Sequence, residues 1–208
     1  MFKSLTHTFA LDKPSELELI NVTVEPSTYR GRSGLRLIEQ DLTSSKESTA
    51  ILPDLNFKDG IIETEIMGSP RAYAPEGMRG FVGIAFRVQP HGSQFECFYL
   101  RPTHGRADDQ LRRHHATQYV SHPDYPWFKL REEQPGAYES YTDLVAGKWT
   151  TIKIVVSGIS AQLFVNGAEQ ACLIVNDLKL GEIEGQIALW IGAGTEAHFT
   201  KILVQRLE

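Results

Sequence analysis

The sequence predicts an all-β protein folded as a two-sheet antiparallel sandwich. Apolar and polar residues alternate over many short segments, turn signals separate these segments, and no stretch keeps a helical repeat over several turns. Closely spaced strands without intervening helices favour a sandwich over a parallel α/β sheet. The 208 residues suit one large sandwich, so we expect a single domain over residues 1–208.

Two strand patterns stand out in the middle of the chain. Residues 60–66 follow a glycine turn, and one face of the strand carries Ile62, Thr64 and Ile66. Residues 80–88 alternate in the same way, and the face predicted to enter the core carries Val82, Ile84, Phe86 and Val88. Residues 94–100 return as a strand after a turn, which predicts a hairpin.

Strand patterns also flank this central region. Asn166-Gly167 is a strong hairpin signal, because both residues tolerate the positive φ of a type I′ turn. Further strands are expected at 152–156, 161–165, 185–191 and 198–204, and shorter ones around 17–24 and 35–39. In 185–191 the alternation places Ile187, Leu189 and Ile191 on the core face.

Residues 101–140 break the strand rhythm and are rich in His, Arg, Asp and aromatic residues. A long irregular segment inside a folded domain is usually functional or disordered, and the aromatic residues argue against disorder. We therefore expect a functional loop region at about 101–140 carried on the rigid sheets.

Composition excludes some classes of partner. The formal net charge of −5 gives no basic field for phosphates, so neither nucleic acid nor an anionic membrane surface is an expected partner. The N-terminal residues lack the apolar segment of a secretory signal, which predicts a cytoplasmic protein, or a secreted or periplasmic one whose signal has been removed. Cys97 and Cys172 are expected to be small buried hydrophobes, with a disulfide as the alternative. The oligomeric state stays open.

Five segments together resemble the concanavalin A-like lectin/glucanase superfamily, most closely its bacterial keto-disaccharide hydrolase-type and laminin-G-like domains: 57–66, 82–87, 147–149, 163–167 and 185–190. The resemblance implies a jelly-roll sandwich with carbohydrate bound in a concave groove or on its rim loops. Members of this superfamily include glycosidases and lectins, while others bind proteins. The chain lacks the Glu-x-Asp-x-x-Glu run of laminarinase-type glucanases and a recognisable legume-lectin metal loop.

Side-chain alternation suggests two ligand-binding residues on the sheets. If Val82, Ile84 and Phe86 enter the core, Arg87 should point away from it. By the same alternation, Trp190 should lie on the face opposite to Ile187, Leu189 and Ile191. An indole and a guanidinium on an open sheet face suit the C–H face and the hydroxyls of a sugar. The alternatives are a Trp190 covered by the loop region and an Arg87 paired with Glu63 or Glu65.

Glu96 is the strongest candidate for a general acid. It lies in an otherwise apolar strand, where a carboxyl must be paired or have a raised pKa. Alternation leaves its direction open, because Phe95, Cys97 and Tyr99 compete with Phe98 and Leu100 for the core face. The alternative is a structural salt bridge from Glu96 to Arg87 or Arg101.

The loop region supplies the remaining candidates. Acid–base roles are assigned to Asp108, Asp109 and His115 beside Glu96, and substrate-binding roles beside Arg87 and Trp190 to Arg101, Arg112, His114, Gln118, Tyr119, His122 and Trp127. No metal and no cofactor are expected, since the histidines show no recognised ligand spacing. Glu132, Glu133, Glu139 and Asp143 are expected to be solvated.

Three functions remain open at this point, with carbohydrate as the expected ligand of the first two. The first is a glycoside hydrolase-like enzyme acting on a glycan or oligosaccharide through Glu96 and a second carboxyl. The second is a non-catalytic, lectin-type module. The third, ranked last, is a protein-interaction sandwich with a large apolar patch and no groove.

Overall fold

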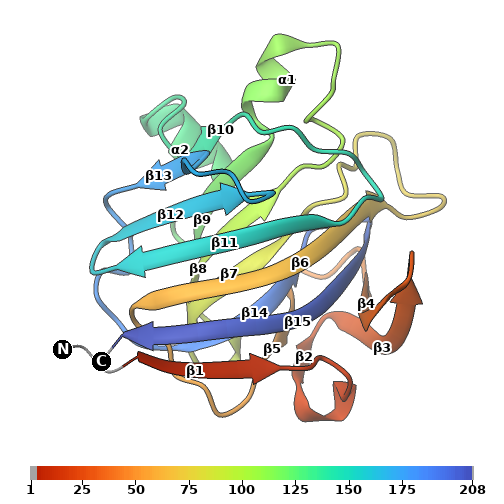
Figure 1. Cartoon of the computed structure of the whole chain (residues 1–208). Coiled ribbons are helices and arrows are strands. Elements are labelled where there is room, and N and C mark those ends of the chain that lie inside the picture. The colour runs from red at the N-terminus through yellow and green to blue at the C-terminus, as the bar shows by residue number, and fades with distance from the viewer. Residues whose placement is uncertain (1–3, 208) are drawn as a thin grey trace.

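Two antiparallel sheets pack face to face, which confirms the sandwich predicted from the sequence (Figure 1). The computed structural model describes residues 4–207. Sheet A has the strand order β13-β12-β11-β6-β15-β4-β3, and β1 pairs with the C-terminal half of β15. Its strands are β1 (Ser4–Phe9), β3 (Val22–Tyr29), β4 (Arg32–Glu39), β6 (Gly60–Pro70), β11 (Thr150–Ser157), β12 (Ser160–Val165), β13 (Leu173–Val175) and β15 (Thr195–Leu207).

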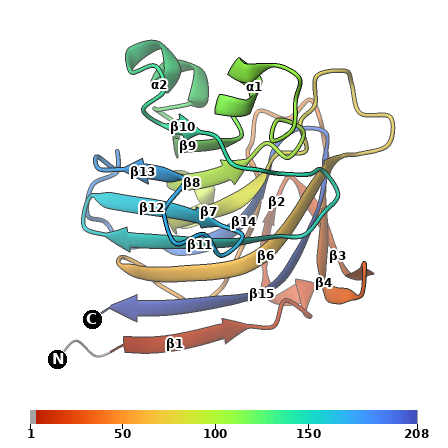
Figure 2. The ribbon, with the colours of Figure 1, turned by 45° about the horizontal axis from the view of Figure 1, so that its top comes forward.

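Sheet B has the order β10-β9-β8-β7-β14-β5-β2. Its strands are β2 (Glu18–Ile20), β5 (Ser48–Ile51), β7 (Val82–Val88), β8 (Phe95–Leu100), β9 (Thr117–His122), β10 (Glu139–Ser140) and β14 (Gln186–Ile191). Two short helices, α1 (Gln110–His114) and α2 (Trp127–Glu133), stand together at one end of the sandwich near β9 and β10 (Figure 2). Two 3₁₀ turns, Pro14–Glu16 and Pro90–Gly92, complete the fold.

The main core lies between the sheets and uses the predicted faces. Ile62 and Ile66 from β6 are buried in it, as are Val82, Ile84 and Phe86 from β7. Burial of each such side chain contributes about 1.5–3 kcal/mol of transfer free energy. Ile187, Leu189 and Ile191 of β14 also lie in this core, as the alternation predicted.

A second apolar cluster covers the other face of sheet B. Its buried members are Ile51, Ala85, Val88, Phe95, Cys97, Tyr99, Ala188 and Trp190. Val88 therefore lies on the face opposite to the predicted one. The reason is the backbone at Arg87, which has φ 54°, together with a register shift between Gln186 and Ala188 in the β14–β7 pairing. Such a bulge interrupts the alternation of side chains.

Residues 101–140 are more regular than the sequence suggested. They contain α1, β9, α2 and β10, and β9 pairs with β8 along its whole length. This strand escaped prediction because its sequence, Thr-Gln-Tyr-Val-Ser-His, is mostly polar, yet all six of its residues are buried or half-buried among neighbouring elements. Segment 101–140 thus extends sheet B as well as capping it.

The two cysteines are free thiols. Cys97 is buried in the second apolar cluster, and Cys172 is half-buried and packs against the main core. The expected role as small hydrophobes agrees with these positions. Within residues 4–207, no helix is long and apolar enough to cross a membrane.

Candidate functional site

A groove of about 590 Å³ opens on the outer face of sheet B, the face that carries the second apolar cluster. Its floor includes Phe95, Tyr99, Val120, His122 and Trp190. The walls come from the segment before β5, the segment before β7 and the first turns of α2, and they include Leu42, Ser44, Ser45, Lys46, Glu47, Gly77, Arg79, Phe81, Trp127 and Arg131.

One row of residues crosses sheet B under this groove. The strand registers place these positions side by side: Thr49, Trp190, Gly83, Tyr99, Gln118 and Glu139. Gly83 has no side chain between its two aromatic neighbours, so the Tyr99 and Trp190 rings stack with centroids 4.8 Å apart. Phe81 meets the edge of Tyr99 at 5.9 Å. The middle of the groove floor is therefore aromatic.

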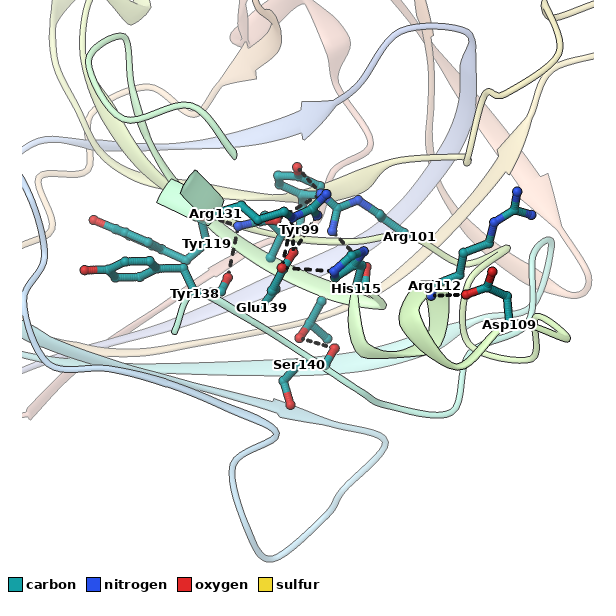
Figure 3. Close-up of polar contacts among 12 residues, drawn as sticks. Tyr99, Arg101, Asp109, Arg112, His115, Tyr119, Arg131, Tyr138, Glu139 and Ser140 are labelled. Carbon is teal, nitrogen blue, oxygen red and sulfur yellow. Dashed lines mark hydrogen bonds and ion pairs between the residues drawn. The ribbon is translucent and has the colours of Figure 1, made fainter. Parts of the chain in front are cut away.

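Glu139 anchors one end of the row (Figure 3). Its carboxylate accepts hydrogen bonds from Arg131 of α2, the shortest at 2.6 Å, and lies 3.1 Å from Nε2 of His115. The Glu139 side chain is only 5% exposed, so the expectation that it is solvated was wrong. The turn before β10 brings it beneath α2, where the Arg131 guanidinium compensates its buried charge.

Arg101 lies beside this pair at the end of β8 and is 4% exposed. Its guanidinium donates to Oη of Tyr99 (3.0 Å), to Oε1 of Gln118 (2.9 Å) and to the carbonyl oxygen of His115 (2.8 Å). All three acceptors are neutral. Burial lowers the pKa of Arg101, although the guanidinium stays protonated, as arginine does in proteins.

The opposite end of the aromatic floor carries a carboxylate and an imidazole. Nε1 of Trp190 donates to Oε2 of Glu47 over 2.8 Å, and Nδ1 of His122 lies 3.7 Å from Oε1 of the same carboxylate. The His122 ring stacks on Phe95 with centroids 4.9 Å apart. Glu47 remains 37% exposed, so it faces both the protein and the solvent of the groove.

His104 lines the groove from the segment after β8 and is 9% exposed. Neither ring nitrogen has a well-aligned hydrogen bond, although the His115 backbone lies close enough to favour protonation in part. Burial, followed by the charges of Arg101 and Arg79, lowers the pKa of His104 to about 4. The ring is therefore neutral at pH 7, with one N–H donor and one acceptor nitrogen.

The structure brings five of the predicted site residues to the groove: Arg101, His115, His122, Trp127 and Trp190. Gln118 is 1% exposed and lies under them, where it orients Arg101 and donates to the carbonyl oxygen of Tyr138. Trp190 does lie opposite the core residues of β14, as alternation predicted.

Glu96 lies on the wrong face for the predicted role. Phe95, Cys97 and Tyr99 belong to the outer face, so Glu96 points between the sheets and is fully buried. Its two oxygens accept from Oη of Tyr119 (2.6 Å) and from the backbone N–H of Leu180 (2.8 Å). Burial raises the pKa of Glu96, as expected for a carboxyl in an apolar strand. Tyr119 is likewise in the core, away from the groove.

Arg87 is buried as well, which corrects the expectation that it faces solvent. Its guanidinium donates to the carbonyl oxygens of Lys58 (3.0 Å), Gly158 (2.7 Å) and Gly181, and it lies 3.3 Å from the Asp59 carboxylate. The bulge at Arg87 turns this side chain inward, so it joins three chain segments at the edge of the sandwich. It contributes no atom to the groove lining.

The remaining candidates lie on or before α1 and do not line the groove. Asp109 caps α1 by accepting from the Arg112 N–H at 2.8 Å, and Asp108, Arg112 and His114 are exposed. Figure 3 shows Asp109 and Arg112 apart from the Glu139 cluster. Within residues 4–207, no group of three His, Cys, Asp or Glu side chains could hold a metal ion.

Sequence reasoning missed several groove residues, Glu47, Arg79, Phe81, Tyr99 and Arg131, and also Glu139, which lies beneath the wall. Tyr99 carried a usable signal, since grouping it with Phe95 and Cys97 as one face is correct, but alternation left open whether that face enters the core. The others come from different parts of the chain, including α2 and β10, and only the fold brings them together.

No protein-family profile and no curated protein matches this chain in sequence. Its fold, however, is that of the concanavalin A-like lectins and glucanases. A Bacillus subtilis protein described as having a galectin-like fold is similar, with a TM-score of 0.63, 12% identity, and coverage of 100% of this chain and 99% of that one. The carbohydrate-binding module CBM66 from Bacillus subtilis has a TM-score of 0.59 at 13% identity, with coverage of 92% and 93%.

An enzyme appears among the similar structures too. A prokaryotic β-1,3-1,4-glucanase (lichenase) derived from a mouse hindgut metagenome has a TM-score of 0.54 at 14% identity, and the match covers 96% of this chain and 98% of the enzyme. At these identities the likeness shows the fold alone. The resemblance noted in the sequence is thereby confirmed at the level of the fold.

Proposed function

We propose that this protein binds a carbohydrate in the groove on sheet B. The observation that supports this most directly is the arrangement of the groove: an aromatic floor around Tyr99 and Trp190, flanked by charged groups at both ends. Sugar rings stack their C–H faces on aromatic rings, while their hydroxyls bond to charged donors and acceptors. Trp127, 44% exposed on the wall, adds an aromatic surface that a ligand can reach.

The similar structures favour the same ligand class. Their printed descriptions include a carbohydrate-binding module and a glucanase. A groove of about 590 Å³ is also within the size range of small-molecule binding sites, which favours a short saccharide segment over a large protein surface.

Binding without cleavage is the function that the geometry favours. Glycoside hydrolysis uses two carboxyls flanking the bond, one of which must donate a proton. Glu139 is engaged by Arg131 and lies beside His115 beneath the groove wall, and Glu96 lies in the core on the other face of the sheet. These positions leave Glu47 as the carboxylate with most access to a bound ligand.

Hydrolysis is the second candidate, and Glu47 is the residue that favours it. This carboxylate is 37% exposed in the groove and lies 3.7 Å from His122, so an acid–base pair could act on a ligand there. If so, Glu47→Gln should abolish release of reducing ends while leaving binding intact.

A glycan array followed by calorimetry with the purified chain tests the proposal. We expect saturable binding of a saccharide without product release. Trp127→Ala should weaken binding about tenfold, which corresponds to loss of about 1.4 kcal/mol. Phe128→Ala is the matched control, because Phe128 is 58% exposed on the same helix and does not line the groove. Absence of binding to any saccharide, or equal effects of both variants, would contradict the proposal.

A further inference from the structure

Charge is distributed unevenly along the groove. Three guanidiniums, those of Arg79, Arg101 and Arg131, line it at the end nearer α2, where Glu139 lies beneath the wall. Lys46 also lines the groove, as do the carboxylates of Glu39 and Glu47, so four positive and three negative charges, Glu139 included, leave a sum of +1 in a chain whose net charge is −5. Glu47 lies beyond Trp190, at the opposite end of the aromatic floor.

Two of these cations lack a carboxylate partner. Arg101 donates only to neutral oxygens, and the Arg79 side chain has no hydrogen bond or ion pair within residues 4–207. Arg101 is buried and Arg79 is half-buried, and a guanidinium removed from water without a directly bonded carboxylate is costly because its desolvation is not offset. An anionic ligand group would supply that missing partner.

His104 adds an independent indication at the same place. It is 9% exposed, lines the groove and carries two ring nitrogens without a well-aligned partner. Buried polar groups in folded proteins are nearly always hydrogen-bonded, so an unsatisfied one in a groove suggests a ligand contact. The His104 backbone N–H donates to the carbonyl oxygen of Arg101 at 2.8 Å, and the preceding Thr103 hydroxyl donates to the carbonyl oxygen of Arg79 at 3.4 Å, so these three residues lie near one another at the groove.

We propose that the saccharide bound in this groove is acidic, and that a uronate carboxylate lies among Arg79, Arg101 and His104 while its sugar ring lies over the aromatic floor. This assignment rests on the proposed carbohydrate function and specifies its ligand. A planar carboxylate matches the fork of a guanidinium, and such charge-assisted hydrogen bonds are about twice as strong as neutral ones. A neutral sugar would leave the two unpartnered guanidiniums uncompensated.

Matched pairs of ligands, with and without the carboxylate, test whether the charge of the saccharide contributes to binding by the unchanged protein. Short oligogalacturonates, oligomannuronates and oligoguluronates are titrated calorimetrically against their carboxyl-reduced, neutral counterparts. At least one acid should bind about tenfold or more tightly than its reduced form, as expected for one charge-assisted contact. The affinity for the acid should also fall as salt is raised, because screening weakens the attraction.

Single substitutions then test whether the Arg79 guanidinium binds the ligand carboxylate. Arg79→Gln should weaken binding of the preferred uronate about tenfold and weaken binding of its reduced form by a clearly smaller factor. Arg112→Gln is the control, since Arg112 is an exposed guanidinium outside the groove lining. Thermal unfolding of both variants verifies that each is folded.

The outcomes separate the two proposals. If neutral saccharides bind as tightly as uronates and Trp127→Ala weakens them, the groove binds carbohydrate and the acidic assignment is wrong. Preference for sulfated oligosaccharides over every uronate would also overturn the carboxylate assignment. If neither acidic nor neutral saccharides bind, both the proposed function and this inference fail.

Discussion

Tyr99 and Trp190 stack at 4.8 Å although their strands, β8 and β14, are separated by β7. Adjacent strands are about 4.8 Å apart, so two side chains on alternate strands normally have a third between them. Gly83 occupies that intermediate position and leaves it empty. The aromatic floor of the groove therefore depends on a residue that contributes no side chain.

The first prediction follows from this glycine. A Cβ at position 83 would lie 2.2 Å from the carbonyl oxygen of Phe98 and 2.6 Å from Cβ of Tyr99, so Gly83→Ala must displace backbone. We expect the free energy of unfolding to fall by about 2 kcal/mol. Urea denaturation measures it. Thr49→Ala, in the same row of the sheet, removes atoms instead of adding them and should cost about 1 kcal/mol or less. Equal costs would argue against close packing at Gly83.

The second prediction concerns the Glu139 pair. Glu139→Gln removes the charge that compensates Arg131 and leaves a cluster of guanidiniums without its carboxylate. Because the Arg131 side chain is 31% exposed, solvent offsets part of the penalty, and we expect a loss of about 2 kcal/mol in unfolding free energy. The control is Glu133→Gln, which changes a half-exposed carboxylate on α2, the helix that carries Arg131. It should lower the unfolding free energy by less than about 0.5 kcal/mol. A loss at Glu139 no greater than at Glu133 would show that the pair is not structural.

The third prediction separates stability from binding at Glu96. Both oxygens of this carboxyl accept hydrogen bonds in the core, and an amide can satisfy only one of the two donors. Glu96→Gln should therefore lower the free energy of unfolding by about 2 kcal/mol, yet leave saccharide affinity unchanged. A large change in affinity or activity in a correctly folded variant would restore the functional role that the sequence suggested.

The same residue predicts a pH dependence. Burial raises the pKa of Glu96 in the folded state, so the folded chain holds a proton that the unfolded chain releases. The stability from this site is fully present below the unfolded pKa of about 4.3 and is lost as pH rises through the folded pKa. The difference in unfolding free energy between the wild type and Glu96→Gln should therefore shrink as pH rises from about 4.3 through the folded pKa of Glu96. Urea denaturation at each pH measures this difference. A constant difference would contradict the burial effect.

The fourth prediction has the opposite sign and concerns His104. Its pKa is lowered to about 4, so the unfolded chain takes up a proton near pH 6.5 that the folded chain refuses. Between about pH 6.5 and pH 4 the wild type should lose up to about 3 kcal/mol more stability than His104→Leu. An NMR titration of the His104 ring gives an independent measurement, and an apparent pKa near 6.5 would refute the prediction.

Much of the architecture follows from local sequence. Alternation in residues 60–66 and 185–191 placed the correct side chains in the core, because a pleated strand can bury only one face against the other sheet. The same reasoning failed at Arg87, where a bulge interrupts the period. It also failed for β9, because the sequence of this strand is mostly polar although neighbouring elements bury its side chains.

The sequence by itself determined the sandwich and its main strands, since these depend on alternation, turn residues and composition. Only the tertiary structure decided which face of β8 enters the core, and therefore that Tyr99, not Glu96, reaches the groove. It alone brought Glu47, Arg79 and Glu139 near the same aromatic floor. Strand order across a sheet places distant segments side by side, and the spacing of residues along the chain carries no record of that order.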